Sequence, residues 1–222
     1  MDYSGKTILV VGASGVLGGA LTERFASQGA MVLGTASSQE SSSRMGISVH
    51  SKFVVDLESV QSIQQFCELL NAQQLDGIVL ASGRVGFANL DSTSAEQAQR
   101  LMQINHLGLT QLVSALKAKL NEGAFVAALT GVVAERSFPG MAAYCASKAA
   151  LSAWLSSARF ELKKQGVATI ELRPGHTETG LATRPLFGVA PQMGAGMQAS
   201  HVVDRIMAAV EARTQLVAST DF

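Results

Sequence analysis

The sequence predicts one α/β domain over residues 1–222, built on a doubly wound parallel sheet of about seven strands with helices on both faces. Two observations carry this prediction. Short apolar runs rich in β-branched residues alternate along the chain with segments of helical period. No linker, internal repeat or long low-complexity stretch divides the 222 residues. Continuous apolar runs are typical of strands that are buried on both faces, as in a parallel sheet.

The predicted elements follow one another in βα order. Strands are expected at residues 6–11, 31–35, 52–55, 77–81, 124–129, 168–172 and 215–218. Helices are expected at residues 16–28, 59–71, 94–120, 142–165 and 200–213. Leu17, Leu21 and Phe25 lie at four-residue spacing in the first helix, and Gly29 is its expected C-cap. The serine-rich segment 36–46 has no apolar period and is predicted to be a loop.

Composition excludes several classes of protein. Seventeen basic residues balance seventeen acidic ones, which argues against a nucleic-acid or membrane-surface partner. Charged residues are 15% of the chain, against ~25% on average, and hydrophobic residues are 47%, so we expect much buried area, including the interface of a homodimer or homotetramer. Cys67, Cys145 and four scattered histidines have no metal-binding spacing. Because signal-peptide and membrane-spanning patterns are lacking, a cytoplasmic protein is expected.

Glycines follow the first predicted strand in the pattern G-x-x-G-x-x-G. There Gly12 would make a tight turn, Gly15 would let a pyrophosphate approach the backbone, and Gly18 would let the helix pack closely. The helix N-terminus offers free N–H groups to phosphates. The pattern predicts a Rossmann-like dinucleotide site, and the same loop supplies the further expected contacts Ser14, Val16 and Leu17. The alternative is that these are only turn and packing glycines.

The end of the second predicted strand bears on the choice of dinucleotide. It carries no carboxylate for an NAD ribose, whereas Ser37 and Ser38 can donate to a 2′-phosphate and Arg44 follows. This favours NADP, with NAD possible; the alternative is a solvated serine loop. Asp56 and Leu57 follow the third strand and are expected at the adenine edge, the alternative being an N-terminal cap of the next helix.

Tyr144 and Lys148 lie four residues apart in a predicted helix, which places them on one face. A nearby ammonium favours the phenolate, so we expect the pKa of Tyr144 to be lowered. Such a phenol can exchange a proton with a carbonyl oxygen near neutral pH. The alternative is an interfacial tyrosine beside a lysine whose stem covers apolar surface.

Together these features resemble the short-chain dehydrogenase/reductase family over essentially the whole chain. The matching residues are the Gly12–Gly18 loop, Asp56, Ala81-Ser82-Gly83, Asn105, Tyr144 with Lys148, and Arg173-Pro174-Gly175 followed by Thr179. The resemblance implies hydride transfer between a nicotinamide cofactor and a carbonyl or alcohol carbon of a small-molecule substrate. Tyr144 would then be the acid/base, Lys148 would hold the nicotinamide ribose and tune Tyr144, and Asn105 would support a proton relay.

The resemblance also implies a nicotinamide site and an oligomer. Pro174, Gly175, Thr177 and Thr179 would hold the carboxamide, and the turn Ala81-Ser82-Gly83 would line the cofactor. A homo-oligomer is typical of the family.

The chain departs from the family's pattern at three places. Val16 stands where the commonest members have glycine, and the usual Asn-Asn-Ala-Gly turn reads Leu80-Ala81-Ser82-Gly83. The usual catalytic serine is missing. Counting along the fifth strand places Thr130 there, whereas counting back from Tyr144 reaches Gly131.

We therefore expect a one-residue insertion with Thr130 as the replacement hydroxyl, and Ser137 is the second candidate. If neither acts, the alternative is an NADP-binding sensor or regulatory protein with weak or no catalysis. The glycine spacing also suggests an isomerase or epimerase as a third hypothesis.

Residues 180–199 lack a helical period and contain Pro185 and Pro191. A loop of this length in a compact domain is usually a lid or binding loop. It predicts a cover that excludes water from an apolar substrate of small to medium size. The apolar candidates are Leu181, Leu186, Phe187, Val189, Met193 and Met197. The alternative is that they pack on the core and contact no substrate.

Overall fold

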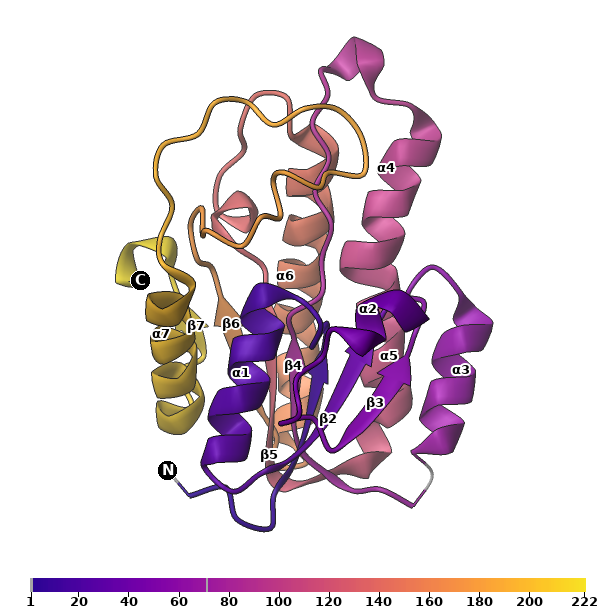
Figure 1. Ribbon diagram of the computed structural model, residues 1–222, viewed down its shortest axis with the longest axis vertical. Coiled ribbons are helices and arrows are strands. Elements are labelled where there is room, and N and C mark those ends of the chain that lie inside the picture. The colour runs from indigo at the N-terminus through magenta and orange to yellow at the C-terminus, as the bar shows by residue number, and fades with distance from the viewer. Residues whose placement is uncertain (1, 71) are drawn as a thin grey trace.

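A seven-stranded parallel sheet in the order β3-β2-β1-β4-β5-β6-β7 forms the centre of the protein. The structure is a computed structural model that describes residues 2–70 and 72–222 (Figure 1). The strands are β1 Thr7–Val11, β2 Met31–Ala36, β3 Ser51–Val54, β4 Leu75–Leu80, β5 Leu120–Leu129, β6 Ala168–Leu172 and β7 Leu216–Val217. The principal helices are α1 Val16–Ser27, α2 Gln39–Ser43, α3 Val60–Leu69, α4 Ala95–Met102, α5 Gly108–Leu116, α6 Ala142–Lys163 and α7 Ala199–Ala212.

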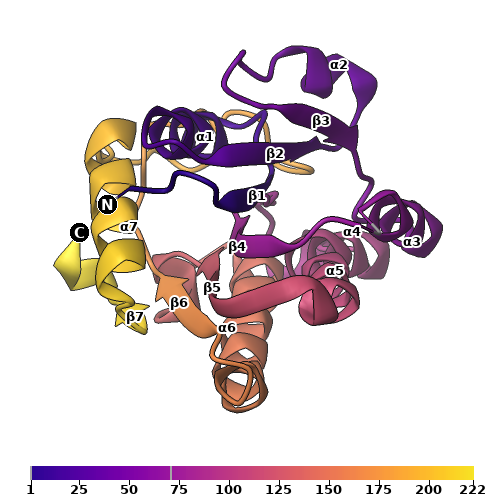
Figure 2. The same cartoon turned by 90° about the horizontal axis from the view of Figure 1, so that it is seen from below.

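Helices cover both faces of this sheet, as predicted. Figure 2 shows α1 and α7 on one side and α3, α5 and α6 on the other. Side chains of β1 alternate between the two layers, with Ile8 and Val10 packed in the α1/α7 layer and Leu9 and Val11 in the α3/α5/α6 layer. The two apolar layers bury nearly all of every central strand, which explains the continuous apolar runs in the sequence.

The strand order reverses between β1 and β4, because the chain builds β1, β2 and β3 outward and then crosses back to β4. In such open sheets, ligands bind beyond the carboxyl ends of the strands at this switch point. The segments that follow β1, β4, β5 and β6 therefore position the candidate site.

Two elements differ from the sequence prediction. The segment 36–46, predicted to be a loop, contains α2, because Ser38 caps it and exchanges hydrogen bonds with Ser41 in a capping box. The long helix predicted at 94–120 is broken by a π-helical turn at Gln103–Leu107 and ends before β5 begins at Leu120. The predicted end of the second helix at Asn71 lies outside the described residues.

Membrane-spanning helices and metal-binding clusters are both absent from residues 2–70 and 72–222. No helix there is long and apolar enough to cross a membrane. No group of three or more His, Cys, Asp or Glu side chains there is placed to hold a metal ion.

Candidate active site

The glycine loop, residues 12–18, runs from the end of β1 into the first turn of α1. Packing leaves no room for a side chain at Gly12 and Gly18, whereas Gly15 has room for one. A Cβ on Gly12, whose φ is 90°, would lie 2.8 Å from the Cα of Ser82. A Cβ on Gly18 would lie 2.1 Å from the carbonyl oxygen of Gly12. Gly15, the N-cap of α1, is exposed, and the nearest atom to a Cβ there would be that same oxygen at 3.4 Å. The backbone at the start of α1 is thus accessible from outside, beside the exposed side chain of Val16.

The end of β2 carries hydroxyls and no carboxylate. The Thr35 hydroxyl accepts a hydrogen bond from the Gly12 amide at 3.3 Å, which ties β2 to the glycine loop. The Ser38 hydroxyl accepts from the Ser41 amide, and Arg44 forms an ion pair with Glu40 at 2.9 Å. Of the predicted phosphate contacts Ser37, Ser38 and Arg44, the exposed Ser37 is therefore the one without such a partner among the described residues.

The turn after β3 presents Asp56 at the surface and buries Leu57. Asp56 Oδ1 accepts from the Glu58 amide at 2.9 Å, and the Asp56 amide donates to Ser62 Oγ at 3.0 Å. The capping role that was the alternative for Asp56 belongs to Ser59, whose side chain accepts from the Ser62 amide. The exposed edge of Asp56 thus remains available to a ligand.

Asn105 lies in the π-helical turn and is fully buried. Its Oδ1 accepts from the Arg84 amide at 2.8 Å, and its Nδ2 donates to the Arg84 carbonyl at 2.8 Å and to Ser147 Oγ at 2.9 Å. Ser147 in turn donates to the carbonyl of Tyr144 at 2.7 Å. The π-turn therefore places the Asn105 side chain where it bonds both to the segment after β4 and to helix α6. This double contact gives a reason for the irregular turn between α4 and α5.

Tyr144 and Lys148 lie on the inner face of α6, only 8% and 5% exposed. Lys148 Nζ donates to the carbonyl of Leu129, at the end of β5, at 2.9 Å. A Cβ on Gly83 would lie 3.1 Å from Lys148 Nζ and 3.4 Å from Asn105 Oδ1. The ends of β4 and β5, the π-turn and α6 thus bring Asn105, Lys148 and Gly83 together.

Burial controls the protonation of this pair. It lowers the pKa of Lys148 to about 8 and raises the pKa of Tyr144 well above its ordinary value. The prediction that the ammonium lowers the pKa of Tyr144 is therefore wrong for this structure, because burial removes the phenol from water and Cys145 raises the pKa further. Tyr144 is held as the neutral phenol, which is the form that donates a proton.

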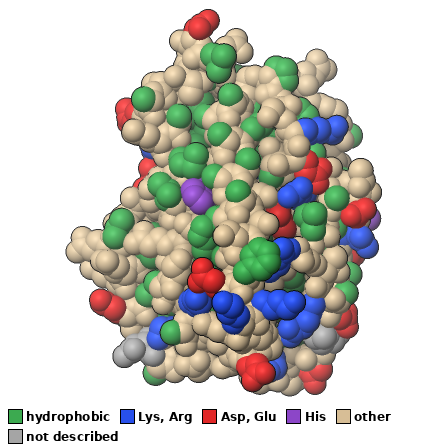
Figure 3. All heavy atoms as spheres, turned by 180° about the vertical axis from the view of Figure 1, so that it is seen from behind, with side chains coloured by type: hydrophobic (Ala, Val, Ile, Leu, Met, Phe, Trp, Pro, Cys, Tyr) green, Lys and Arg blue, Asp and Glu red, His purple; other side chains and the backbone are tan. Residues whose placement is uncertain are grey.

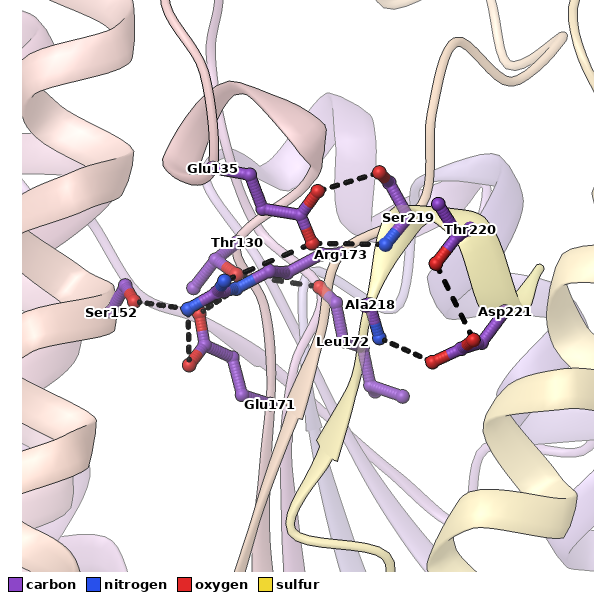
Figure 4. Close-up of polar contacts among 10 residues, drawn as sticks. All are labelled: Thr130, Glu135, Ser152, Glu171, Leu172, Arg173, Ala218, Ser219, Thr220 and Asp221. Carbon is purple, nitrogen blue, oxygen red and sulfur yellow. Dashed lines mark hydrogen bonds and ion pairs between the residues drawn. The ribbon is translucent and has the colours of Figure 1, made fainter.

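Thr130, the expected replacement hydroxyl, follows β5 and is completely buried. Its Oγ1 donates to Glu171 Oε1 at 2.8 Å and lies 3.4 Å from the carbonyl oxygen of Leu172 (Figure 4). Ser137, the second candidate, is exposed on the following loop, and Gly131 has a φ of 80°. The structure thus gives the Thr130 hydroxyl a protein carboxylate as its partner.

The turn after β6 lies against the loop after β5, since the Val132 amide donates to the Pro174 carbonyl at 2.9 Å. Thr177 Oγ1 donates to the Gly175 carbonyl at 3.0 Å, and Thr177 pairs with Met197 as a β-bridge. Thr179 Oγ1 accepts from the Leu181 amide at 3.4 Å. The predicted carboxamide contacts therefore form the base from which residues 180–199 extend.

Residues 180–199, the lid, arch over the carboxyl ends of the strands (Figure 1, orange). The lid is fastened at its middle, where the Leu186 amide donates to the Val85 carbonyl at 2.8 Å and the Phe87 amide donates to the Phe187 carbonyl at 3.1 Å. Leu186 and Phe187 pack with Val85, Phe87 and Tyr144 in one apolar cluster. The apolar lid residues therefore fall into a packed group and an exposed group. Leu181 also packs in this cluster, whereas Val189 is 86% exposed.

Substitution of one glycine should loosen the lid. A Cβ on Gly86 would lie 2.3 Å from the ring of Phe187, whereas a Cβ on Gly194 would have no atom within 4 Å. We expect Gly86→Ala to displace Phe187 and to increase amide hydrogen exchange of residues 85–87 and 186–188 by at least ~10-fold, since local opening exposes those amides. Gly194→Ala is the control in the same lid. Equal exchange in the two variants would show that Phe187 does not fasten the lid.

An exposed helix N-terminus, a strand-order switch and a buried tyrosine–lysine pair at the same edge of the sheet fit a dinucleotide-dependent oxidoreductase. Residues 6–185 match the family described as short chain dehydrogenase. The chain therefore belongs to the short-chain dehydrogenase/reductase family.

The chain is similar in sequence to dehydrogenases and reductases and similar in fold to solved dehydrogenase structures. The chain is 30% identical over 187 residues to 2,3-dihydro-2,3-dihydroxybenzoate dehydrogenase of Escherichia coli, covering 82% of this chain and 73% of that protein. It is 25% identical over 188 residues to a 3-oxoacyl-(acyl-carrier-protein) reductase of Rickettsia bellii, covering 83% and 78%. A short chain dehydrogenase of Burkholderia cenocepacia in complex with NADP superposes with a TM-score of 0.83 at 24% identity, over 98% of this chain and 89% of that one. A Burkholderia phymatum homologue in complex with NAD gives 0.87 at 20% identity, over 99% and 90%.

Proposed function

We propose that this oxidoreductase uses NADP in preference to NAD and interconverts a carbonyl and an alcohol on a small, apolar substrate, with Tyr144 as the acid/base. The observation that carries the proposal is the placement of Tyr144 and Lys148 on one face of α6, where Lys148 contacts the end of β5. Both side chains lie at the carboxyl edge of the sheet, and Tyr144 packs with the apolar lid residues Leu186 and Phe187.

The residues present fit a dinucleotide. The open start of α1 at Gly15 suits a pyrophosphate, with Ser14, Val16 and Leu17 beside it. Ser37 suits a 2′-phosphate and Asp56 the adenosine side, whereas Lys148 suits the nicotinamide ribose. When bound, the dinucleotide would supply or accept the hydride. Two structural neighbours are in complex with NADP and NAD, which supports both dinucleotides as candidates.

The protein's own residues then supply the proton and the environment. Neutral Tyr144 would donate its proton to the substrate oxygen during reduction and recover it during oxidation. The Lys148 ammonium, near the carbonyl of Leu129, would compensate negative charge that develops on the phenol. Val85, Phe87 and Phe187 would exclude water and select apolar substrates.

A second candidate function, an NADP-binding sensor or regulatory protein with weak catalysis, is favoured by one observation. The Thr130 hydroxyl, which would polarise the substrate carbonyl, is fully buried and donates to Glu171. Fluorescence titration with NADPH and NADH, followed by a panel of carbonyl substrates, separates the two functions. Tight NADPH binding without oxidation of any substrate would support the sensor, whereas net NADPH consumption would exclude both it and an isomerase or epimerase.

We also propose that the protein acts in the cytoplasm as a homodimer or homotetramer. The outer face of α6 carries Ala146, Ala149 and Ala153 with the 64% exposed ring of Phe160. Figure 3, which views the molecule from the side of this helix, shows hydrophobic side chains spread among few charges, with Lys and Arg gathered below them. Such a face suits contact with another subunit. Sedimentation equilibrium of the wild-type protein and of Phe160→Glu tests the proposal.

The exposed backbone at Gly15 gives a direct test of the pyrophosphate site. Gly15 has a φ of −81°, which alanine adopts without strain, and a Cβ there would meet protein only at 3.4 Å. We expect Gly15→Ala to weaken NADPH binding by ~10-fold and to leave the melting temperature within ~2 °C, because its methyl group would occupy space needed by the phosphates. Gly19→Ala, one turn further along α1, is the matched control and should bind normally. Unchanged affinity in Gly15→Ala would remove this loop from the binding site.

A further inference from the structure

A connected polar network lies beside the active site, on the side of β6 (Figure 4). Its members come from five segments of the chain, and sequence patterns alone did not reveal them as a group. They are Thr130 after β5, Glu135 in the next loop, Ser152 on α6, Glu171 and Arg173 at the end of β6, and Ser219 near the C-terminal end.

Arg173 is the centre of this network. Its Nε donates to Glu171 Oε1 at 2.8 Å and its Nη2 donates to Glu171 Oε2 at 3.2 Å, so the pair is bidentate. Nη2 also donates to Ser152 Oγ at 3.1 Å, and Nη1 lies 3.8 Å from a carboxylate oxygen of Glu135. The Glu135 carboxylate is held by the amide and the hydroxyl of Ser219, at 2.9 and 2.6 Å. Glu171 is only 7% exposed, and these donors replace the hydrogen bonds that water would otherwise make to its carboxylate.

Thr130 joins the network to the active site. Its hydroxyl has one proton, and the 2.8 Å bond to Glu171 Oε1 uses it, so that proton is not available to a substrate oxygen. The preceding residue, Leu129, provides the carbonyl that accepts from Lys148 Nζ. In the peptide group between Leu129 and Thr130, the carbonyl accepts from Lys148 and the amide donates to the Leu172 carbonyl at 2.9 Å, while Glu171 holds the Thr130 side chain.

We propose that Thr130 is a positioning residue: through Glu171 and Arg173 it fixes the end of β5, and with it the Leu129 carbonyl that orients Lys148. This inference rests on the proposed function, because it assigns the alignment of Lys148 to a network that does not contact substrate. It also accounts for a glutamate at the end of the otherwise apolar strand Ala168–Leu172.

Isosteric variants of Thr130 test the proposal. Thr130→Val keeps the shape and removes the hydroxyl, whereas Thr130→Ser keeps the hydroxyl. We expect Thr130→Val to weaken NADPH binding by ~5-fold and to lower kcat by ~10-fold, since Lys148 would be misaligned. Thr130→Ser should restore both quantities to within ~2-fold of wild type. Glu171→Gln should act in the same direction, and the double variant with Thr130→Val should lose less than the product of the two single effects.

Four outcomes would overturn the proposal, and each is recognisable. A loss of at least ~100-fold in kcat for Thr130→Val, with normal NADPH affinity and normal kinetics for Glu171→Gln, would make Thr130 a catalytic donor. A lower melting temperature with unchanged affinity and kcat would make the network structural only. Failure of the wild-type protein to bind NADPH would remove the proposed function and this inference together, whereas normal wild-type binding with an unaffected Thr130→Val would remove this inference alone.

Discussion

Tyr144→Phe should lower kcat by about 10³-fold while the Kd for NADPH stays within ~2-fold of wild type. The substitution removes only the hydroxyl that would donate to the substrate oxygen. The ring would still pack with Val85, Phe87 and Phe187, so the lid and the apolar surroundings should be preserved. Steady-state kinetics with the best substrate of the carbonyl panel, together with NADPH fluorescence titration, measure both quantities.

Tyr3→Phe is the matched control, because Tyr3 is the other of the two tyrosines and is also buried. Its ring packs against Phe25 at 5.1 Å in the α1/α7 layer. Loss of this hydroxyl should leave kcat unchanged. If Tyr144→Phe retained wild-type turnover, the acid/base would have to be another group and the proposed function would lose its main support.

The regular part of the fold could be predicted because its signals are local. The predicted strand 168–172 coincides with β6, and the apolar runs that predict β1 and β2 lie within one residue of the observed strands. Irregular elements were missed, because the hydrogen bonds that create them are specific rather than periodic. Ser38 and Ser41 build α2 from side-chain contacts, and Asn105 lies in a π-turn that a helical period does not distinguish from ordinary helix.

The candidate site was predictable where one element carries it. Tyr144 and Lys148 share a helix face because they are four residues apart, and Gly12 and Gly18 share one loop. The contact between Thr130 and Glu171 was missed, because it joins residues separated by 41 positions on neighbouring strands. An acidic residue within the apolar run 168–172 was the available signal. The direction of the Tyr144 pKa shift depends on burial under the lid. The four-residue spacing to Lys148 gives no information about that burial.

Lys148→Met should abolish detectable turnover and yet stabilise the protein near pH 7. Burial lowers the pKa of Lys148 from 10.5 to about 8, so the folded state disfavours its charge by about 3 kcal/mol when the unfolded chain is protonated. Methionine removes this cost and keeps an apolar stem of similar length. It also loses the charged hydrogen bond to the Leu129 carbonyl, which costs about 2 kcal/mol, so the net gain in the free energy of unfolding is about 1 kcal/mol.

The stability difference between Lys148→Met and the wild type should depend on pH. Because the folded-state pKa is depressed, the unfolded chain binds more protons than the folded protein between pH 8 and 10.5, and wild-type stability rises with pH across that window. The gain from Lys148→Met should therefore be full below pH 8 and shrink as the pH rises toward 10.5. Urea unfolding of both proteins between about pH 7 and 9.5 measures the difference, from which the other titrating groups cancel. Curves that stay parallel over this range would mean that burial does not lower the pKa of Lys148.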